Sequence, residues 1–312
     1  MTQAQSTTTD LTQEMQTYYD RVFLERAEYE QKYNFLAVKK NVPVNSGKVV
    51  YFTRQTAFTP KTAALTEGTT PTGTEFSAST ASATLAEYGD TDQISSLFEL
   101  TSIDKGLKEK VETMGQYAGE SMDTVLRNTI FSGATDQFAG SNTLLTAVNT
   151  SDTMSVSELR KAVLTLKTNK APKWKGGLYR GVISSHGVYN LQGDSTTGNW
   201  TDVNIYNTGE NAEMVKKGVI GVIAGVAVVE SNNEYTQAST TTVYSNFVAG
   251  RGAIGEVDIA GKGNSRTIYK RPGPNDTGNP LDMYSTLSWK VDSYAALVLN
   301  SDWVIDIQCG YE

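Results

Sequence analysis

Residues 104–131 read DKGLKEKVETMGQYAGESMDTVLRNTIF, and this stretch sets the scale of the fold. Its apolar positions recur at steps of three or four, the spacing of one face of an α-helix. They are Leu107, Val111, Met114, Ala118, Met122 and Val125, with Thr129 continuing the series. Gly133 then ends the pattern, as glycine commonly ends helices. A helix of about 27 residues would be about 40 Å long, so we expect a strut rather than an ordinary domain helix.

Two glycines lie one turn apart on this helix. Gly115 and Gly119 fall on nearly the same face, and each costs about 1 kcal/mol of helix propensity relative to Ala. This cost indicates that another backbone approaches closely there. Asp123 and Arg127 have the i,i+4 spacing of a surface ion pair.

The segment before the helix is rich in threonine. Of the 40 Thr in the chain, 11 lie among the 32 residues 53–84, where only Phe58, Leu65 and Phe76 are large and apolar. Such a segment cannot bury enough apolar surface to order by itself. Its flanks, 48–54 and 82–95, have strand-like sequences. The segment is therefore either a disordered linker or a two-stranded extension, reaching on the order of 60 Å, that orders against another chain.

An amphipathic helix is expected near the N-terminus. Asp10 offers an N-cap, and apolar residues follow at helical spacing from Leu11 to Phe23, so the helix would run to about residues 27–33. It either packs on the core of its own chain or serves as an arm on a neighbouring subunit. Residues 1–9 lack the features of a signal peptide. The longest apolar stretch, 219–229, is too short to span a membrane and is either a core strand or a hairpin. We expect a soluble, cytosolic chain with no membrane partner.

Helices and strands mix with short connectors in the rest of the chain, which predicts one α/β or α+β domain at about 150–260. Ser155 and Glu158 form a capping box that opens a helix to about Asn169. A short helix is expected at 187–191. Strands are expected at 179–184, 217–230, 241–250, 253–259 and 266–270, followed by apolar runs at 286–291 and 295–304.

The chain contains few residues of the types that catalytic and metal sites use. Its 312 residues include one Cys and one His, which excludes a disulfide framework and a His-rich metal site within one chain. Gly255 and Gly261-Lys262 have the wrong spacing for a phosphate loop, and Gly263 replaces its Ser/Thr. We therefore expect no metal site and no nucleotide-binding loop.

One hydrolytic alternative stays open. Ser184, Ser185, His186 and Asp194 supply the residue types of a catalytic triad, although neighbours in sequence rarely form its geometry. A structural histidine at a strand-to-helix corner is the simpler interpretation, and a hydrolase using His186 is the alternative.

Positive charge is concentrated in residues 160–180, although the chain carries a net charge of −7. The window contains no acid, and its basic residues are Arg160, Lys161, Lys167, Lys170, Lys173, Lys175 and Arg180. It is either a solvated helix face with a loop, or a patch that meets a polyanion or an acidic neighbour. Trp174 lies within it and offers a ring on which a base could stack.

Several short strings, in this order, resemble the major capsid proteins of tailed bacteriophages, in the family typified by coliphage N-four. They are Tyr19-Asp20-Arg21 with Leu24-Glu25-Arg26-Ala27, Leu65-Thr66-Glu67-Gly68 with Pro71 and Gly73, Tyr88-Gly89-Asp90 with Ile94-Ser95, Asp123 with Leu126-Arg127, Val228-Val229-Glu230-Ser231, and Asn279-Pro280-Leu281 with Trp289-Lys290 and Val298-Leu299-Asn300. The similarity runs from about residue 10 to 309.

This resemblance implies the Johnson fold of phage capsids, with four parts. They are an N-arm (1–45), an extension loop (46–98), a peripheral domain (99–152 and 262–312) with the spine helix at 104–131, and an axial domain (153–261).

The function that the resemblance implies is structural, with no cofactor and no enzymatic activity. It is self-assembly, as hexamers and pentamers, into an icosahedral virion capsid around double-stranded DNA. Assembly would take place in the bacterial host cytoplasm, with scaffolding, portal and decoration proteins as further partners. A bacterial nanocompartment shell of the same fold is the alternative. The expected subunit-interface residues are Tyr19, Arg21, Glu25, Arg26, Phe58, Leu65, Glu67, Gly68, Pro71, Gly73 and Phe76, with Lys167, Lys170, Lys173 and Lys175 as the patch for a polyanion or an acidic neighbour.

Overall fold

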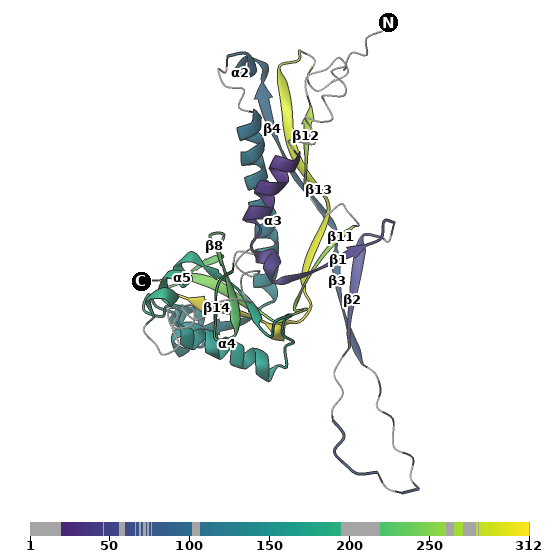
Figure 1. The fold of residues 1–312 in the computed structure, drawn as a ribbon, viewed down its shortest axis with the longest axis vertical. Coiled ribbons are helices and arrows are strands. Elements are labelled where there is room, and N and C mark those ends of the chain that lie inside the picture. Colours follow the sequence, from purple (N-terminus) through teal and green to yellow (C-terminus); the bar gives the residue numbers. More distant parts are fainter. Residues whose placement is uncertain are drawn as a thin grey trace.

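A 27-residue helix, α3 (Leu107–Gly133), runs along one long side of the molecule in the computed structural model shown in Figure 1. The structure describes residues 20–311, except 46, 56–59, 66, 69, 71, 72, 74, 76, 102–106, 195–218, 260–264, 271–278 and 280. The expected spine helix is therefore present, and residues 104–106 of the expected range lie outside the described residues. No helix among the described residues is long and apolar enough to cross a membrane.

A five-stranded sheet lies against α3. Its strands are β1 (Ala37–Val42), β4 (Ala86–Ser95), β11 (Ile254–Ile259), β12 (Arg266–Lys270) and β13 (Tyr284–Val298). The order is β1-β11-β13-β12, and β4 also pairs with β13. The short helix α2 (Ser96–Thr101) follows β4. Apolar side chains from α3 and β13, among them Val111, Met122 and Trp289, form the core between helix and sheet.

The second unit is built on a seven-stranded sheet with the order β5-β14-β10-β6-β8-β7, and β9 pairs with β10. The strands are β5 (Thr135–Phe138), β6 (Tyr179–Ser184), β7 (Val219–Ile223), β8 (Val226–Ser231), β9 (Thr236–Ala238), β10 (Thr242–Ala249) and β14 (Val304–Cys309). Helices α4 (Val156–Thr168) and α5 (Ser185–Gly193) pack on it, with single turns η1 (Tyr33–Phe35), η2 (Ala139–Ser141), η3 (Leu145–Ala147) and η4 (Ser301–Trp303) at the connections.

Of the two interpretations of the apolar stretch 219–229, a core strand or a hairpin, the structure shows the hairpin. Ala224 and Gly225 both have positive φ and form the two-residue turn between β7 and β8. The two apolar runs near the C-terminus do not correspond to one strand each. The single strand β13 covers 286–291 and continues to Val298, and a turn at Asn300 then leads into β14.

Each sheet combines strands from distant parts of the chain. β5 and β14 both belong to the seven-stranded sheet, and β11 pairs with β1 and β13 in the sheet along α3. Each packed unit is therefore held together by hydrogen-bonded pairing of segments that are far apart in sequence.

A two-stranded hairpin projects from the rest of the fold (Figure 1). Its strands β2 (Val49–Gln55) and β3 (Ala78–Thr84) pair along seven residues each, so the ladder is shorter than the limbs of about 20 residues expected from the sequence. Leu85 is buried and separates β3 from β4 where one strand was expected over 82–95. Val50, Ala83 and Leu85 pack with residues of β11 and β13, which anchors the base of the hairpin.

Candidate assembly interface

The N-terminal helical segment packs on the spine helix of its own chain. Residues 20–30 are helical, and Phe23 and Ala27 are buried against α3. A Cβ added at Gly115 would lie 2.8 Å from the carbonyl oxygen of Phe23, and one at Gly119 would lie 2.5 Å from that of Ala27. The two backbones thus touch at the glycines. For the described part of this helix, the structure shows packing on its own core, whereas Tyr19 and the preceding residues lie outside the described residues.

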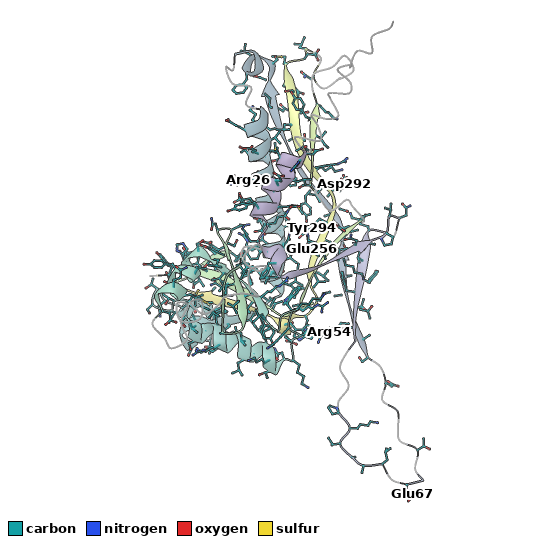
Figure 2. All side chains as sticks on the ribbon, viewed as in Figure 1. Arg26, Arg54, Glu67, Glu256, Asp292 and Tyr294 are labelled. Atoms are coloured by element: carbon teal, nitrogen blue, oxygen red, sulfur yellow. The ribbon has the colours of Figure 1, made fainter. Side chains whose placement is uncertain are left out.

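The polar face of the same helical segment remains exposed. Arg21 and Glu25 form an ion pair of 3.1 Å, with side chains 79% and 67% exposed. Arg26 lies beside α3 (Figure 2), where it pairs with Glu30 and donates a hydrogen bond to the Gln116 side chain. Exposed ion pairs of this kind contribute at most about 1 kcal/mol, so Arg21 and Glu25 are available to a partner at little cost.

The tip of the extension carries apolar and glycine residues that the chain itself leaves uncovered. Leu65 is 78% exposed, and Gly68, at φ 79°, has nothing within 4 Å of its Cβ position. Glu67 lies at the far end of the extension (Figure 2), and Gly73 is exposed. Phe58, Pro71 and Phe76 lie outside the described residues.

Three further residues on β2 of this hairpin are interface candidates that were not predicted from the sequence. Tyr51 is 65% exposed on β2, and Val49 on the same face is 40% exposed. The Arg54 guanidinium lies 5.1 Å from the Trp303 ring centroid, which links the hairpin to the seven-stranded unit. Successive side chains of a strand point to opposite faces, so the predicted strand 48–54 already places Val49 and Tyr51 on one face. Nothing in the sequence indicates the Arg54 contact.

A buried polar network joins the N-terminal segment, the spine helix and the β8–β9 loop. The predicted Asp123–Arg127 surface pair is wrong, because Asp123 is only 1% exposed. Its carboxylate accepts hydrogen bonds from the Tyr33 amide (2.9 Å) and the Asn233 side chain (3.3 Å), and burial raises its pKa to about 7. Arg127 instead donates to the Asn233 side chain (2.6 Å) and the Glu234 carbonyl (3.0 Å). This network fixes how the two units meet.

The basic window divides into engaged and exposed residues. Lys161 pairs with Glu158 at 2.8 Å, and the Arg180 guanidinium lies 3.8 Å from the Trp174 ring centroid. One face of the Trp174 ring is thereby covered, which weakens the idea of base stacking there. The remaining lysines, at the end of α4 and in the following loop, are exposed; they are Lys167, Lys170, Lys173 and Lys175.

His186 and its neighbours in sequence make structural contacts. The His186 ring lies 4.6 Å from the Tyr244 ring and 4.2 Å from the Tyr311 ring, and its Nε2 is 3.9 Å from a Glu234 carboxylate oxygen. The Ser184 hydroxyl is buried and caps α5 by accepting from the Gly187 amide. Asp194 accepts a hydrogen bond from the Val156 amide. Within the described part of the chain, no three His, Cys, Asp or Glu residues are grouped so as to hold a metal ion.

Solved phage capsid structures match this fold along nearly its whole length. The capsid of Ralstonia phage GP4 has a TM-score of 0.66 at 15% identity, covering 90% of this chain and 89% of that one. The capsid of cyanophage Pam1 has a TM-score of 0.63 at 13% identity, covering 92% and 93%. The capsid of a gene transfer agent particle has a TM-score of 0.57 at 11% identity, covering 91% and 90%.

No protein-family model and no curated protein matches the sequence. The structural matches confirm the α+β fold of phage capsid proteins that the sequence predicted. The finer resemblance to the coliphage N-four-like family stays a prediction.

Proposed function

We propose that this chain is a structural major capsid protein, which self-assembles into an icosahedral shell around phage DNA through overlapping N-arms and extension loops. The observation that carries this proposal is the match to capsid structures over about nine-tenths of both chains.

The exposed extension supports an assembly role on physical grounds. Its two-stranded ladder has little core of its own beyond the base, and an isolated hairpin is only marginally stable. A tip that carries Leu65 in solvent gains apolar burial by docking on another subunit. Many such contacts, each modest, multiply in effect once a lattice closes, so assembly errors can dissociate while the finished shell holds.

The partners in this proposal are other copies of the chain, arranged as hexamers and pentamers, and double-stranded DNA on the inner face. Scaffolding, portal and decoration proteins are further proposed partners, and assembly takes place in the host cytoplasm before the shell becomes part of the virion. A nanocompartment shell of the same fold would enclose a protein instead. Since one structural match is the capsid of a gene transfer agent, the contents have to be measured.

The direct test is electron microscopy of the full-length chain after expression and purification. Closed, uniform shells are expected, and the extracted contents distinguish nucleic acid from a protein cargo. A chain that stays monomeric at high concentration, with and without DNA and crowding agents, would contradict the proposal.

A pair of matched variants then tests the role of the extension tip. Leu65→Asp places a charge at the exposed tip and is expected to abolish closed shells while the subunit still unfolds at the wild-type temperature. Leu144→Asp introduces the same charge at another exposed leucine, in a loop of the other unit, and is expected to leave assembly intact. Equal assembly by both variants would remove the extension from the mechanism.

A further inference from the structure

A polar cavity of about 180 Å³ lies beneath the N-terminal helical segment. Its walls come from that segment, from α3 and from the sheet of β1, β11 and β13; Figure 2 places Glu256 and Tyr294 together at this junction. Several polar side chains line it, among them Glu28, Gln31, Asn34 and Ser265. At about 30 Å³ per water molecule, the volume suits several waters or the end of one extended side chain.

Two carboxylates on β11 interact with the same lysine, Lys39, and one of them, Glu256, lines the cavity. Glu256 is 7% exposed, and one of its oxygens lies 3.5 Å from the Lys39 ammonium. The other oxygen, Oε2, is buried and has no hydrogen-bond partner. Asp258, two residues further on β11 and therefore on the same face, also has a buried oxygen without a partner. Glu28 adds a third carboxylate at the exposed end of the lining.

This arrangement leaves negative charge uncompensated. Burial raises the pKa of both Glu256 and Asp258, while the Lys39 charge acts on both in the opposite direction. A buried carboxylate oxygen without a donor carries a desolvation penalty that one shared and half-exposed lysine does not offset. A second cation in the cavity would supply the missing charge and the missing hydrogen-bond donors.

We propose that this cavity binds a primary alkylammonium group. An ammonium group carries one positive charge and three N–H donors, which fits the partnerless oxygen of Glu256 together with the neighbouring amide and hydroxyl oxygens. Divalent metals prefer six or more oxygen ligands, and no group of three His, Cys, Asp or Glu side chains in the described residues is placed to supply them. The ammonium group belongs either to a small free amine or to a lysine side chain of a second copy.

The test measures thermal unfolding of the unassembled full-length chain in n-butylammonium chloride, against sodium chloride at equal ionic strength. The unfolding temperature of the wild type is expected to rise saturably with the amine. Glu256→Gln is expected to weaken the fitted amine affinity by about tenfold or more, because the group facing the ammonium loses its charge. Glu120→Gln removes an exposed carboxylate of α3, outside the cavity, and is expected to bind like the wild type.

A second variant reverses the sign of the effect. Lys39→Gln removes the only cation lining the cavity among the described residues, so it is expected to bind the amine more tightly than the wild type. Lys39 is mostly exposed, which makes this variant suitable even if Glu256→Gln fails to fold. Absence of a rise in both the wild type and Lys39→Gln, or an equal rise in Glu256→Gln, would overturn the proposal.

Assembled shells then identify the source of the ammonium group. Shells that exclude the amine, although unassembled chains bind it, indicate a lysine from a second copy in the cavity. Shells that still bind it indicate a free amine. Since the primary assay uses unassembled chains, its result does not depend on whether the chain forms shells.

Discussion

At the scale of single residues, Gly119 is the position with the least tolerance for added volume on the spine helix. The prediction is that Gly119→Ala lowers the free energy of unfolding by about 1–2 kcal/mol. Its Cβ would lie 2.5 Å from the Ala27 carbonyl oxygen and 2.9 Å from the Ala27 Cα, both backbone atoms. Overpacking of this kind costs typically 1–3 kcal/mol, which outweighs the ~1 kcal/mol that alanine gains in helix propensity.

Denaturant unfolding of the unassembled chain measures this difference. Glu120→Ala, at the next and exposed position of α3, is the control and is expected to change stability by less than about 0.5 kcal/mol. A Gly119→Ala variant as stable as the wild type would show that the two helices separate without cost.

Asp306 is one of the buried carboxylates that link stability to pH. It is fully buried on β14, accepts hydrogen bonds from Ser245 (3.0 Å) and Gln308 (2.9 Å), and burial raises its pKa to about 7. The neighbouring strand contributes Asp136, which the same Gln308 amide contacts. The unfolded chain releases this proton near pH 4, so between about pH 4 and 7 the folded state binds more protons and stability falls as pH rises.

The prediction is that Asp306→Asn flattens this pH dependence. The variant is expected to match the wild type at pH 4.5 and to exceed it at pH 8 by on the order of 1–3 kcal/mol, because the amide removes a buried charge. Urea unfolding at both pH values checks this, with exposed Asp302→Asn as the control. A larger gain at pH 4.5 than at pH 8 would contradict the assignment.

At the scale of elements, exposed lysines are concentrated at the end of α4 and in the loop that follows it. The prediction is that replacing Lys167, Lys170, Lys173 and Lys175 with Gln weakens binding of the unassembled chain to double-stranded DNA. Each phosphate contact contributes about 0.9 to the slope of log K against log salt, so the loss of four lysines is expected to reduce the slope by up to about 3.6.

A matched control carries the same change in net charge elsewhere. It replaces Lys48, Lys61, Lys110 and Lys270 with Gln and is expected to reduce the slope much less. Equal effects from the two quadruple variants would contradict a specific role of the α4 lysines in DNA binding. An acidic neighbouring subunit would then be the proposed partner of these lysines.

The sequence correctly predicted the elements whose formation depends on residues close by in the chain. Ser155 caps α4 as expected, and β6 and β12 cover the predicted residues because their bounds follow short apolar runs. β1 was missed, because Ala37–Val42 is half polar and gains its strand form by pairing in parallel with β11, more than 200 residues away. The assignment of β14 to its sheet depends on β10 and β5 in the same way.

The sequence predicted where the candidate interface lies in the chain, but not which residues pack against its elements. Threonine enrichment and the few large apolar residues located the extension, yet the paired part is limited to seven residues per strand. The glycine spacing on α3 indicated a close backbone without saying whose, and the structure places Phe23 and Ala27 of the same chain there. The burial of Asp123 had no local signal, since it depends on Tyr33 and Asn233.

At the scale of the whole molecule, the fold consists of two packed units and one projecting arm (Figure 1). The Asp123 network and the Arg54–Trp303 contact connect these parts inside one chain. The arm contributes little to that internal packing beyond its base, where Val50, Ala83 and Leu85 are buried. A change in the arm should therefore affect shell assembly without affecting the stability of the subunit.

Deleting residues 60–75 is predicted to produce that separation. The described residues in this range are all exposed, and the deletion leaves the β2–β3 ladder and its buried base in place. The free energy of unfolding is expected to stay within about 1 kcal/mol of the wild type, because shortening a loop changes closure entropy only slightly. Shell formation, measured by light scattering and electron microscopy, is expected to be lost, because each subunit loses its contact beyond the hairpin. Normal shells from this variant would refute the role of the arm, and a variant that fails to fold would place the arm in the core of the subunit.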